Sequence, residues 1–117
     1  EMEEVLAGHA AVAECAVVGC NDELKGQIPI GFVVLKHAND GNEAEIEQEL
    51  MQRIRETIGA LASLKKVYFL ERLPKTRSGK ILRKIIRCIV DEVSFNPPST
   101  IEDMTVLDEI RWVVGRG

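Results

Sequence analysis

Apolar residues recur along the chain with two spacings, and the changes between them predict the order of helices and strands. Apolar positions three or four residues apart indicate an amphipathic helix, whereas short apolar runs rich in branched or aromatic side chains indicate strands. The pattern predicts a helix over 2–9, strands over 10–19 and 29–36, a helix over 43–58, a strand over 66–71 and a helix over 81–93.

The clearest of these helices lies in the middle of the chain. Ile46, Leu50, Ile54 and Ile58 recur every fourth residue, while charged and amide side chains fill most positions between them. That spacing forms one apolar stripe along a helix. Gly59 follows directly, in the position where a left-handed residue commonly ends a helix.

The order of elements predicts the fold class. The strands over 10–19 and 29–36 are expected to pair antiparallel, joined by a long polar loop over 20–27,. A linker over 96–100, with two prolines, precedes a short terminal helix that begins at Glu102,. We therefore expect one α+β domain: a small three-stranded sheet with helices packed on it.

The composition is that of a globular domain, because 45% of the residues are hydrophobic and 29% are charged,. No run approaches the ~20 apolar residues of a spanning helix, and the N-terminus is acidic where a signal peptide would be basic. We expect a soluble intracellular protein that engages no membrane. Because the chain begins without Met and directly on a helical pattern, we also expect that a segment upstream of it is missing.

Cysteine and histidine offer no metal site. Cys15, Cys20 and Cys88 are odd in number, and none has a second sulfur or a histidine at the spacing of metal ligands,. The cysteines fit a reducing compartment. His9 and His37 stand alone, and no chemical role is assigned to either.

Positive charge gathers in one stretch, although the net charge of the chain is −4. Seven of the fifteen cations lie between Arg72 and Arg87, and no acid lies among them. This stretch includes residues 73–83, which read Leu-Pro-Lys-Thr-Arg-Ser-Gly-Lys-Ile-Leu-Arg. The sequence therefore predicts one basic patch on an acidic body.

The loop within this stretch is a candidate anion site. Pro74 interrupts the preceding strand, and Ser78-Gly79 permits a sharp turn before the next helix. Lys80 is expected at or next to the start of that helix, where the helix dipole is positive and a bound anion would compensate the cations. Phosphate and carboxylate are the candidate anions, and a solvated surface loop is the alternative.

The residues of the loop argue against two more specific kinds of site, a P-loop that binds phosphate and a nucleic-acid-binding surface. A P-loop requires Gly and Ser or Thr at the positions that Pro74 and Ile81 occupy here,. Nucleic-acid binding would favour aromatic residues for stacking, but the basic stretch has none and the rest of the chain is acidic,. No nucleic-acid partner is expected.

Residues 73–83 resemble the C-terminal signature of AMP-forming acyl-CoA synthetases, within the superfamily of adenylate-forming enzymes. Other segments are similar to short-chain members such as acetyl- and propionyl-CoA synthetases. These segments are Val17-Val18-Gly19, Lys25-Gly26-Gln27, Phe32-Val33, Arg55 before Ile58-Gly59, and Ser99-Thr100-Ile101-Glu102-Asp103.

The resemblance implies a fold, a domain division and a reaction. Residues 1–95 would be the small C-terminal lid domain, truncated at its N-terminus, and 96–117 a linker and C-terminal tail helix. The whole ligase would convert a short-chain carboxylic acid, ATP and CoA into acyl-CoA, AMP and pyrophosphate. Its own N-terminal adenylation domain would hold ATP, the acid and Mg²⁺, so the isolated lid is expected to be inactive.

The resemblance also assigns roles to individual residues. Lys80 matches the lysine that contacts the acyl carboxylate and the nucleotide phosphate during adenylation, after which the lid rotates and presents another face for attack by CoA. Arg55 matches the position that meets the 3′-phosphate of CoA, although an exposed helical arginine can equally be solubilising. Lys25 and Gly26 are candidates for the CoA path, with an ordinary loop as the alternative.

Two further possibilities follow from the basic loop. The chain as given has an alternative function, as a stand-alone module that binds an anion or an acidic partner through this loop. In the ligase, a lysine acetyltransferase and a deacetylase acting on Lys80 would be partners, because acetylation removes the charge. The compartment expected for the ligase is the cytoplasm or the mitochondrial matrix.

Overall fold

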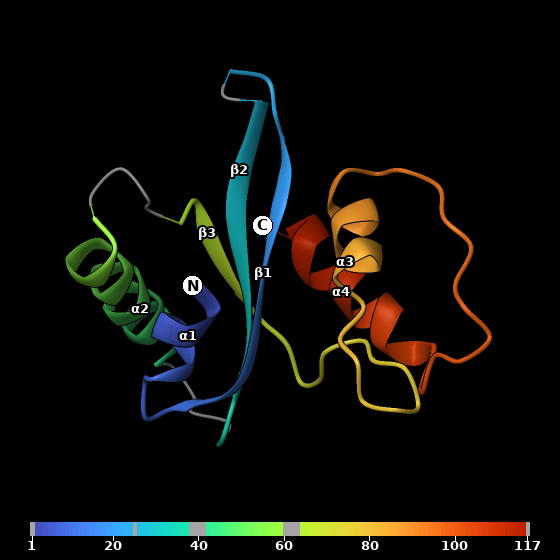
Figure 1. Ribbon diagram of the computed structural model, residues 1–117, viewed down its shortest axis with the longest axis horizontal. Coiled ribbons are helices and arrows are strands. Elements are labelled where there is room, and N and C mark those ends of the chain that lie inside the picture. Colours follow the sequence, from blue (N-terminus) through green and yellow to red (C-terminus); the bar gives the residue numbers. More distant parts are fainter. Residues whose placement is uncertain (1, 25, 38–41, 60–63, 117) are drawn as a thin grey trace.

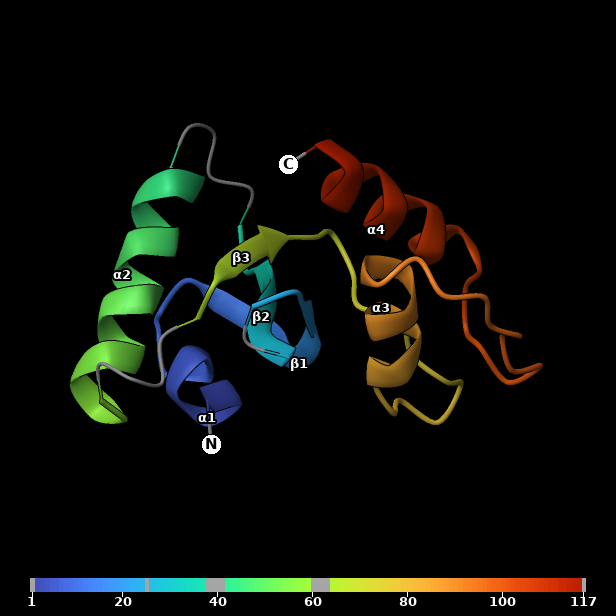
Figure 2. The ribbon, with the colours of Figure 1, turned by 90° about the horizontal axis from the view of Figure 1, so that it is seen from above.

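A three-stranded sheet separates two layers of helices in this protein (Figures 1 and 2). The structure is a computed structural model, and it describes residues 2–24, 26–37, 42–59 and 64–116. The elements are α1 Met2–Ala7, β1 Val12–Asp22, β2 Gly26–Leu35, α2 Glu43–Thr57, β3 Lys66–Phe69, α3 Arg83–Val90 and α4 Thr105–Arg116. The predicted α+β class with a small three-stranded sheet is confirmed.

The sheet has the order β1-β2-β3 and mixes two kinds of pairing. β1 and β2 are antiparallel, with Val12 opposite Leu35 at one end and Asp22 opposite Gly26 at the other. β2 and β3 are parallel, because α2 lies between them in sequence and returns the chain to the same end,. The antiparallel pair was expected from the sequence, and the parallel edge strand completes the sheet.

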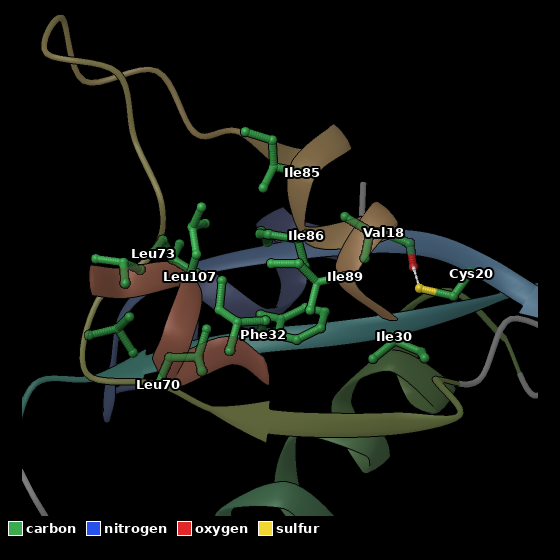
Figure 3. Close-up of a cluster of buried hydrophobic side chains, with 14 of the residues drawn as sticks. Val18, Cys20, Ile30, Phe32, Leu70, Leu73, Ile85, Ile86, Ile89 and Leu107 are labelled. Atoms are coloured by element: carbon green, nitrogen blue, oxygen red, sulfur yellow. Dashed lines mark hydrogen bonds between the residues drawn. The ribbon is translucent and has the colours of Figure 1, made fainter. Parts of the chain in front are cut away.

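Adjacent residues of β2 face the two layers alternately, as the pleat of a strand requires. Ile30, Phe32 and Val34 belong to a buried cluster with α3 and α4, and Figure 3 shows Phe32 among isoleucines of α3. Val33 belongs to the opposite cluster, which includes Leu50 and other apolar residues of α1 and α2. α1 and α2 therefore lie on one side of the sheet and α3 and α4 on the other (Figure 2), and each helix packs its apolar residues toward the sheet,.

The first hairpin corrects one prediction. The prediction of a long loop over 20–27 is wrong, because β1 continues to Asp22 and β2 begins at Gly26. Cys20 is only 1% exposed and still faces the core, so the polar sequence around it extends the strands beyond the apolar run. Gly26 has a φ of +85°, a conformation that favours glycine where the chain turns into β2,.

The helices confirm their predicted positions with small shifts at their ends. α2 buries Ile46, Leu50 and Ile54, and Gly59 follows it with a φ of +130°. α3 begins at Arg83, two residues later than the apolar pattern predicts, and α4 begins at Thr105. No helix of the described residues is long and apolar enough to cross a membrane.

The C-terminal segment shares the core of the rest of the chain. Ile101, Val106, Leu107 and Ile110 lie in the same buried cluster as Phe32. α4 packs on α3, and Figure 3 shows Leu107 beside the isoleucines of α3. The division into a lid at 1–95 and a tail at 96–117 stays a prediction.

Candidate functional site

The basic loop after β3 is a hydrogen-bonded hairpin that presents Lys80. Lys75 and Ile81 form an antiparallel bridge, and the Thr76 amide donates to the carbonyl of Lys80 at 2.9 Å. The Leu82 amide donates to the carbonyl of Pro74 at 2.9 Å, which closes the base of the hairpin. Lys80 thus lies three residues before α3, and its expected place at the helix start is wrong because the chain first completes this turn.

The tip of the hairpin is held by local hydrogen bonds. The Gly79 amide donates to the carbonyl of Thr76 at 2.9 Å, and Gly79 has a φ of +93° that favours glycine at this position,. The hydroxyl of Thr76 accepts a hydrogen bond from the Lys80 amide at 3.1 Å and shares another with Ser78 at 2.9 Å. The turn residues of the motif therefore fix the backbone of Lys80.

The other edge of the hairpin pairs with the C-terminal segment. Thr76 and Ile101 form an antiparallel bridge. The Arg77 amide donates to the carbonyl of Thr100 at 2.8 Å, and the Glu102 amide donates to the carbonyl of Lys75 at 2.8 Å. Sequence reasoning missed this contact because single bridges leave no periodic pattern, and the resemblance of residues 99–103 to short-chain synthetases was the only signal.

Within the described residues, acids outside the basic stretch form ion pairs with four of its seven cations. The stretch itself has no acid, so the partners come from α1, β1, the end of α3 and the segment before α4. The ion pairs are Lys75 with Glu14, Arg83 with Glu3, Arg87 with Asp91 at 3.6 Å and Arg72 with Asp103 at 2.8 Å. The predicted basic patch is therefore smaller in the folded chain than in the sequence.

Lys80 is one of the cations of the stretch that keep no counter-charge. Arg77, Lys80 and Lys84 are exposed, and none forms an ion pair within residues 2–24, 26–37, 42–59 and 64–116. Lys80 therefore projects an uncompensated ammonium from a fixed backbone. Such a group is available to an anionic ligand without first breaking an internal pair.

Two of the ion pairs are strengthened by further hydrogen bonds. Glu3 accepts both guanidinium contacts of Arg83, at 2.8 and 2.5 Å, and also the amide of Val17 at 2.8 Å. These bonds, chiefly those from Arg83, hold the pKa of Glu3 below its usual value against the opposing effect of burial. Hydrogen bonds from Thr105 and Arg72 lower the pKa of Asp103 to about 2.

The other predicted site residues lie apart from Lys80. Arg55 is exposed in the last turn of α2, on the opposite side of the sheet from α3. Gly26 lies at the start of β2, at the hairpin tip, which is at the opposite end of the molecule from the Lys80 loop in Figure 1. Lys25 lies outside the described residues. The fold does not bring these residues into one site with Lys80.

The cysteines and cavities point to no second site of chemistry. Burial raises the pKa of the Cys20 thiol to about 11 and also raises that of Cys15. Within the described ranges, no group of three or more His, Cys, Asp or Glu side chains could hold a metal ion. Two open cavities of about 640 and 660 Å³ lie beside α3–α4 and beside β3, and Lys80 lines neither of them.

Comparison with known proteins yields one family and many relatives. The family model described as "AMP-binding enzyme C-terminal domain" matches residues 1–80. The chain is 52% identical over 109 residues to the acyl-CoA synthetase short-chain family member B, mitochondrial, of Dictyostelium discoideum. This match covers 93% of the chain and 16% of that protein. The chain is 41% identical over 111 residues to the acetyl-coenzyme A synthetase of Pyrobaculum aerophilum, covering 95% and 16%.

Solved structures show the same likeness. The chain resembles an acyl-CoA synthetase from Brucella canis with a TM-score of 0.67 and 37% identity, over 74% of this chain and 16% of that one. The chain thus spans about a sixth of the length of the curated relatives it matches.

Proposed function

The chain belongs to the family of AMP-binding enzyme C-terminal domains, and from that premise we propose that it serves as the lid of an AMP-forming short-chain acyl-CoA synthetase. The whole enzyme joins a carboxylic acid to CoA at the expense of ATP, which leaves as AMP and pyrophosphate. Its own N-terminal adenylation domain is the main partner of the lid. That domain carries the sites for ATP and the acid.

One observation carries the role of the lid: Lys80 presents an exposed ammonium on a hydrogen-bonded backbone, and it forms no ion pair with any described residue. In the adenylation step, a carboxylate oxygen attacks the α-phosphate of ATP, and negative charge builds on the phosphate oxygens. An ammonium placed between carboxylate and phosphate stabilises that charge. A flexible lysine side chain on a rigid loop suits both anions.

Thioester formation uses a different face of the lid. We propose that rotation of the lid withdraws Lys80 and brings the side with α2 and the first hairpin toward CoA. Arg55 then meets the 3′-phosphate of CoA, because a planar guanidinium offers paired donors to phosphate oxygens. Gly26, at the start of β2, and Lys25 are proposed to line the path of CoA.

Mg²⁺ belongs with the adenylation domain in this proposal. The described residues offer no cluster of carboxylates or other ligands for a metal ion. Those residues therefore do not fit a metal site, and no step of the chemistry of the lid is assigned to one. ATP and CoA act as substrates.

Replacing Lys80 tests the proposal in the full-length enzyme. Lys80→Ala should lower acyl-adenylate formation by about 100-fold or more, the usual effect of removing one donor that stabilises transition-state charge. Thioester formation from supplied acyl-adenylate should stay near the wild-type rate. ATP–pyrophosphate exchange across a series of carboxylic acids measures the first step and also identifies the preferred acid.

Lys84→Ala is the matched control, because Lys84 is a second exposed lysine of the basic stretch without an ion pair in the described part of the chain. It should leave both half-reactions unchanged. An equal loss of both half-reactions in Lys80→Ala would contradict a role confined to adenylation.

Lys80 is also the place where this activity would be regulated. We propose that a lysine acetyltransferase and a deacetylase act on it, because acetylation removes the charge that adenylation needs. Its exposure leaves the amine accessible. Mass spectrometry of the protein from its native source should find a fraction acetylated at Lys80, and uniform lack of modification across growth conditions would refute this form of control.

The names of the relatives guide the choice of acid and compartment. We infer a short-chain acid because relatives named acetyl-coenzyme A synthetase and short-chain family synthetase cover nearly the whole chain. Relatives named as mitochondrial support the mitochondrial matrix as one of the two expected compartments, with the cytoplasm as the other.

A further inference from the structure

The C-terminal segment 100–103, here called the strap, pairs with the Lys80 loop through an isolated antiparallel bridge between Ile101 and Thr76. Residues 75–77 lie between the strap and Lys80. They bond to the strap through Thr100 and Glu102 on one side and to Lys80 on the other. The strap is therefore linked to the backbone of Lys80 through one intervening segment, although some twenty residues separate the two in sequence.

The strap is also anchored by contacts outside the hairpin. Ile101 is 8% exposed and belongs to the buried cluster of α3 and α4. Asp103 accepts hydrogen bonds from the amide of Thr105 at 2.9 Å and from its hydroxyl at 2.6 Å, at the start of α4. Its other oxygen pairs with Arg72 at 2.8 Å. The core of the domain thus fixes the strap from below.

These contacts bracket the loop from both ends. Arg72 lies just before the hairpin and is tied to Asp103, whereas Arg77 lies at its tip and is tied to Thr100. Between them the Glu102 amide holds the carbonyl of Lys75. Without the strap, one edge of the hairpin would be open to water and its backbone would be free to sample other positions.

We propose that the strap is a positioning element for Lys80, so that residues 100–103 set the rate of adenylation without touching substrate. This inference rests on the proposed role of Lys80 in the adenylation step. A displacement of about 1 Å in a reacting group can cost a catalyst on the order of 100-fold in rate. Loosening of one hydrogen-bonded edge is therefore expected to matter for the step that uses Lys80 and to be neutral for the step that does not.

Glu102 provides a matched pair of variants in the full-length enzyme. Its side chain is exposed, so Glu102→Pro and Glu102→Ala lose the same carboxylate, but only proline removes the amide that donates to Lys75,. Glu102→Pro should lower kcat for acyl-adenylate formation about tenfold or more at saturating ATP and acid. Glu102→Ala should stay within about twofold of wild type.

Two readouts separate positioning from general stability. Thioester formation from supplied acyl-adenylate should be unchanged in Glu102→Pro. Hydrogen exchange at the Arg77 amide should become faster in Glu102→Pro and stay slow in Glu102→Ala, because that amide bonds to Thr100 of the strap. Equal adenylation rates for the two Glu102 variants would overturn the proposal.

Asp103→Asn is a second test variant, for the case that the proline of Glu102→Pro disturbs folding. Asparagine keeps an oxygen for the Thr105 amide but loses the charge that pairs with Arg72,. It should lower adenylation several-fold and spare the thioester step. Parallel losses in both half-reactions for Glu102→Pro and Asp103→Asn would show that the strap only stabilises the fold. Wild-type adenylation in Lys80→Ala would instead refute the proposed function itself, whatever the strap variants do.

Discussion

Single side chains decide how much of the basic stretch is available to a ligand. Glu3 is the clearest case, because it accepts hydrogen bonds from Arg83 and from the amide of Val17. It lies 80 residues from Arg83 in sequence and ties α1 to the start of α3. Through such pairs the fold leaves Lys80 as a cation without a counter-charge in the described residues.

The Glu3–Arg83 pair predicts a pH-dependent contribution to stability. The folded pKa of Glu3 is lowered, so its ionised form stabilises the fold above its unfolded pKa near 4.5, and this stabilisation is lost as pH falls through the lowered value,. Glu3→Gln should lower the free energy of unfolding at pH 7 by up to about 1 kcal/mol, the range for partly exposed pairs. Urea unfolding of this chain from pH 7 to pH 3 measures it.

The difference between wild type and Glu3→Gln should shrink as the pH falls below 4.5. Glu4→Gln is the control, because Glu4 is exposed and makes no side-chain bond with a described residue. A constant difference across this pH range would show that the three hydrogen bonds to the Glu3 carboxylate, and not its charge, carry the effect of Glu3.

At the level of elements, the sequence predicts helices and strands well and their connections poorly. The helix α2 is predictable because buried positions repeat every three to four residues along a helix, as Ile46, Leu50 and Ile54 do here,. The loop between β1 and β2 was predicted too long, because Asn21 and Asp22 are polar and yet continue the antiparallel pairing of the two strands. Hydropathy reports burial, whereas backbone pairing at an exposed end of a sheet leaves no trace in it.

The candidate site shows the same limit. Lys80 was found from the loop motif and its charge, and the structure places it on a fixed hairpin. The strap and three of the four counter-acids could not be predicted, because their contacts join residues far apart in sequence through one or two bonds. Asp91 is the exception, because it lies four residues after Arg87 at the end of the same helix,. The exposure of Lys80 and Arg55 agrees with the sequence, but their roles depend on substrates that the lid does not hold alone.

The whole molecule is divided by its sheet into two sides with different candidate residues. Lys80 follows the chain onto the side of α3 and α4, whereas Arg55 lies on α2 on the other side (Figure 2). A single orientation of the lid cannot present both sides to one active site. The separation therefore fits a lid that turns between two half-reactions.

This division predicts that Arg55 and Lys80 affect different steps in the full-length enzyme. Arg55→Ala should raise KM for CoA about tenfold, the effect of losing one charged hydrogen bond, and leave ATP–pyrophosphate exchange unchanged. Gln48→Ala is the control, because Gln48 is exposed two helical turns earlier on the same face of α2,. If both variants have the KM of wild type, Arg55 is a solubilising residue.

The register of β2 has a consequence for how this sheet tolerates change. Both faces of the strand are buried and apolar over residues 30–34, and the residues on either side of this stretch, Pro29 and Leu35, are apolar too. A slip by one residue would therefore put no polar group into this part of the core,. Side-chain volume determines the register of β2 instead. Gly31 lies where a Cβ would already stand 3.5 Å from Leu64 and from Val67, and the slip would bring Phe32 to that place. The difference in size between Gly31 and Phe32, rather than an alternation of apolar and polar residues, therefore determines which residues of β2 face the side of the sheet that carries Lys80.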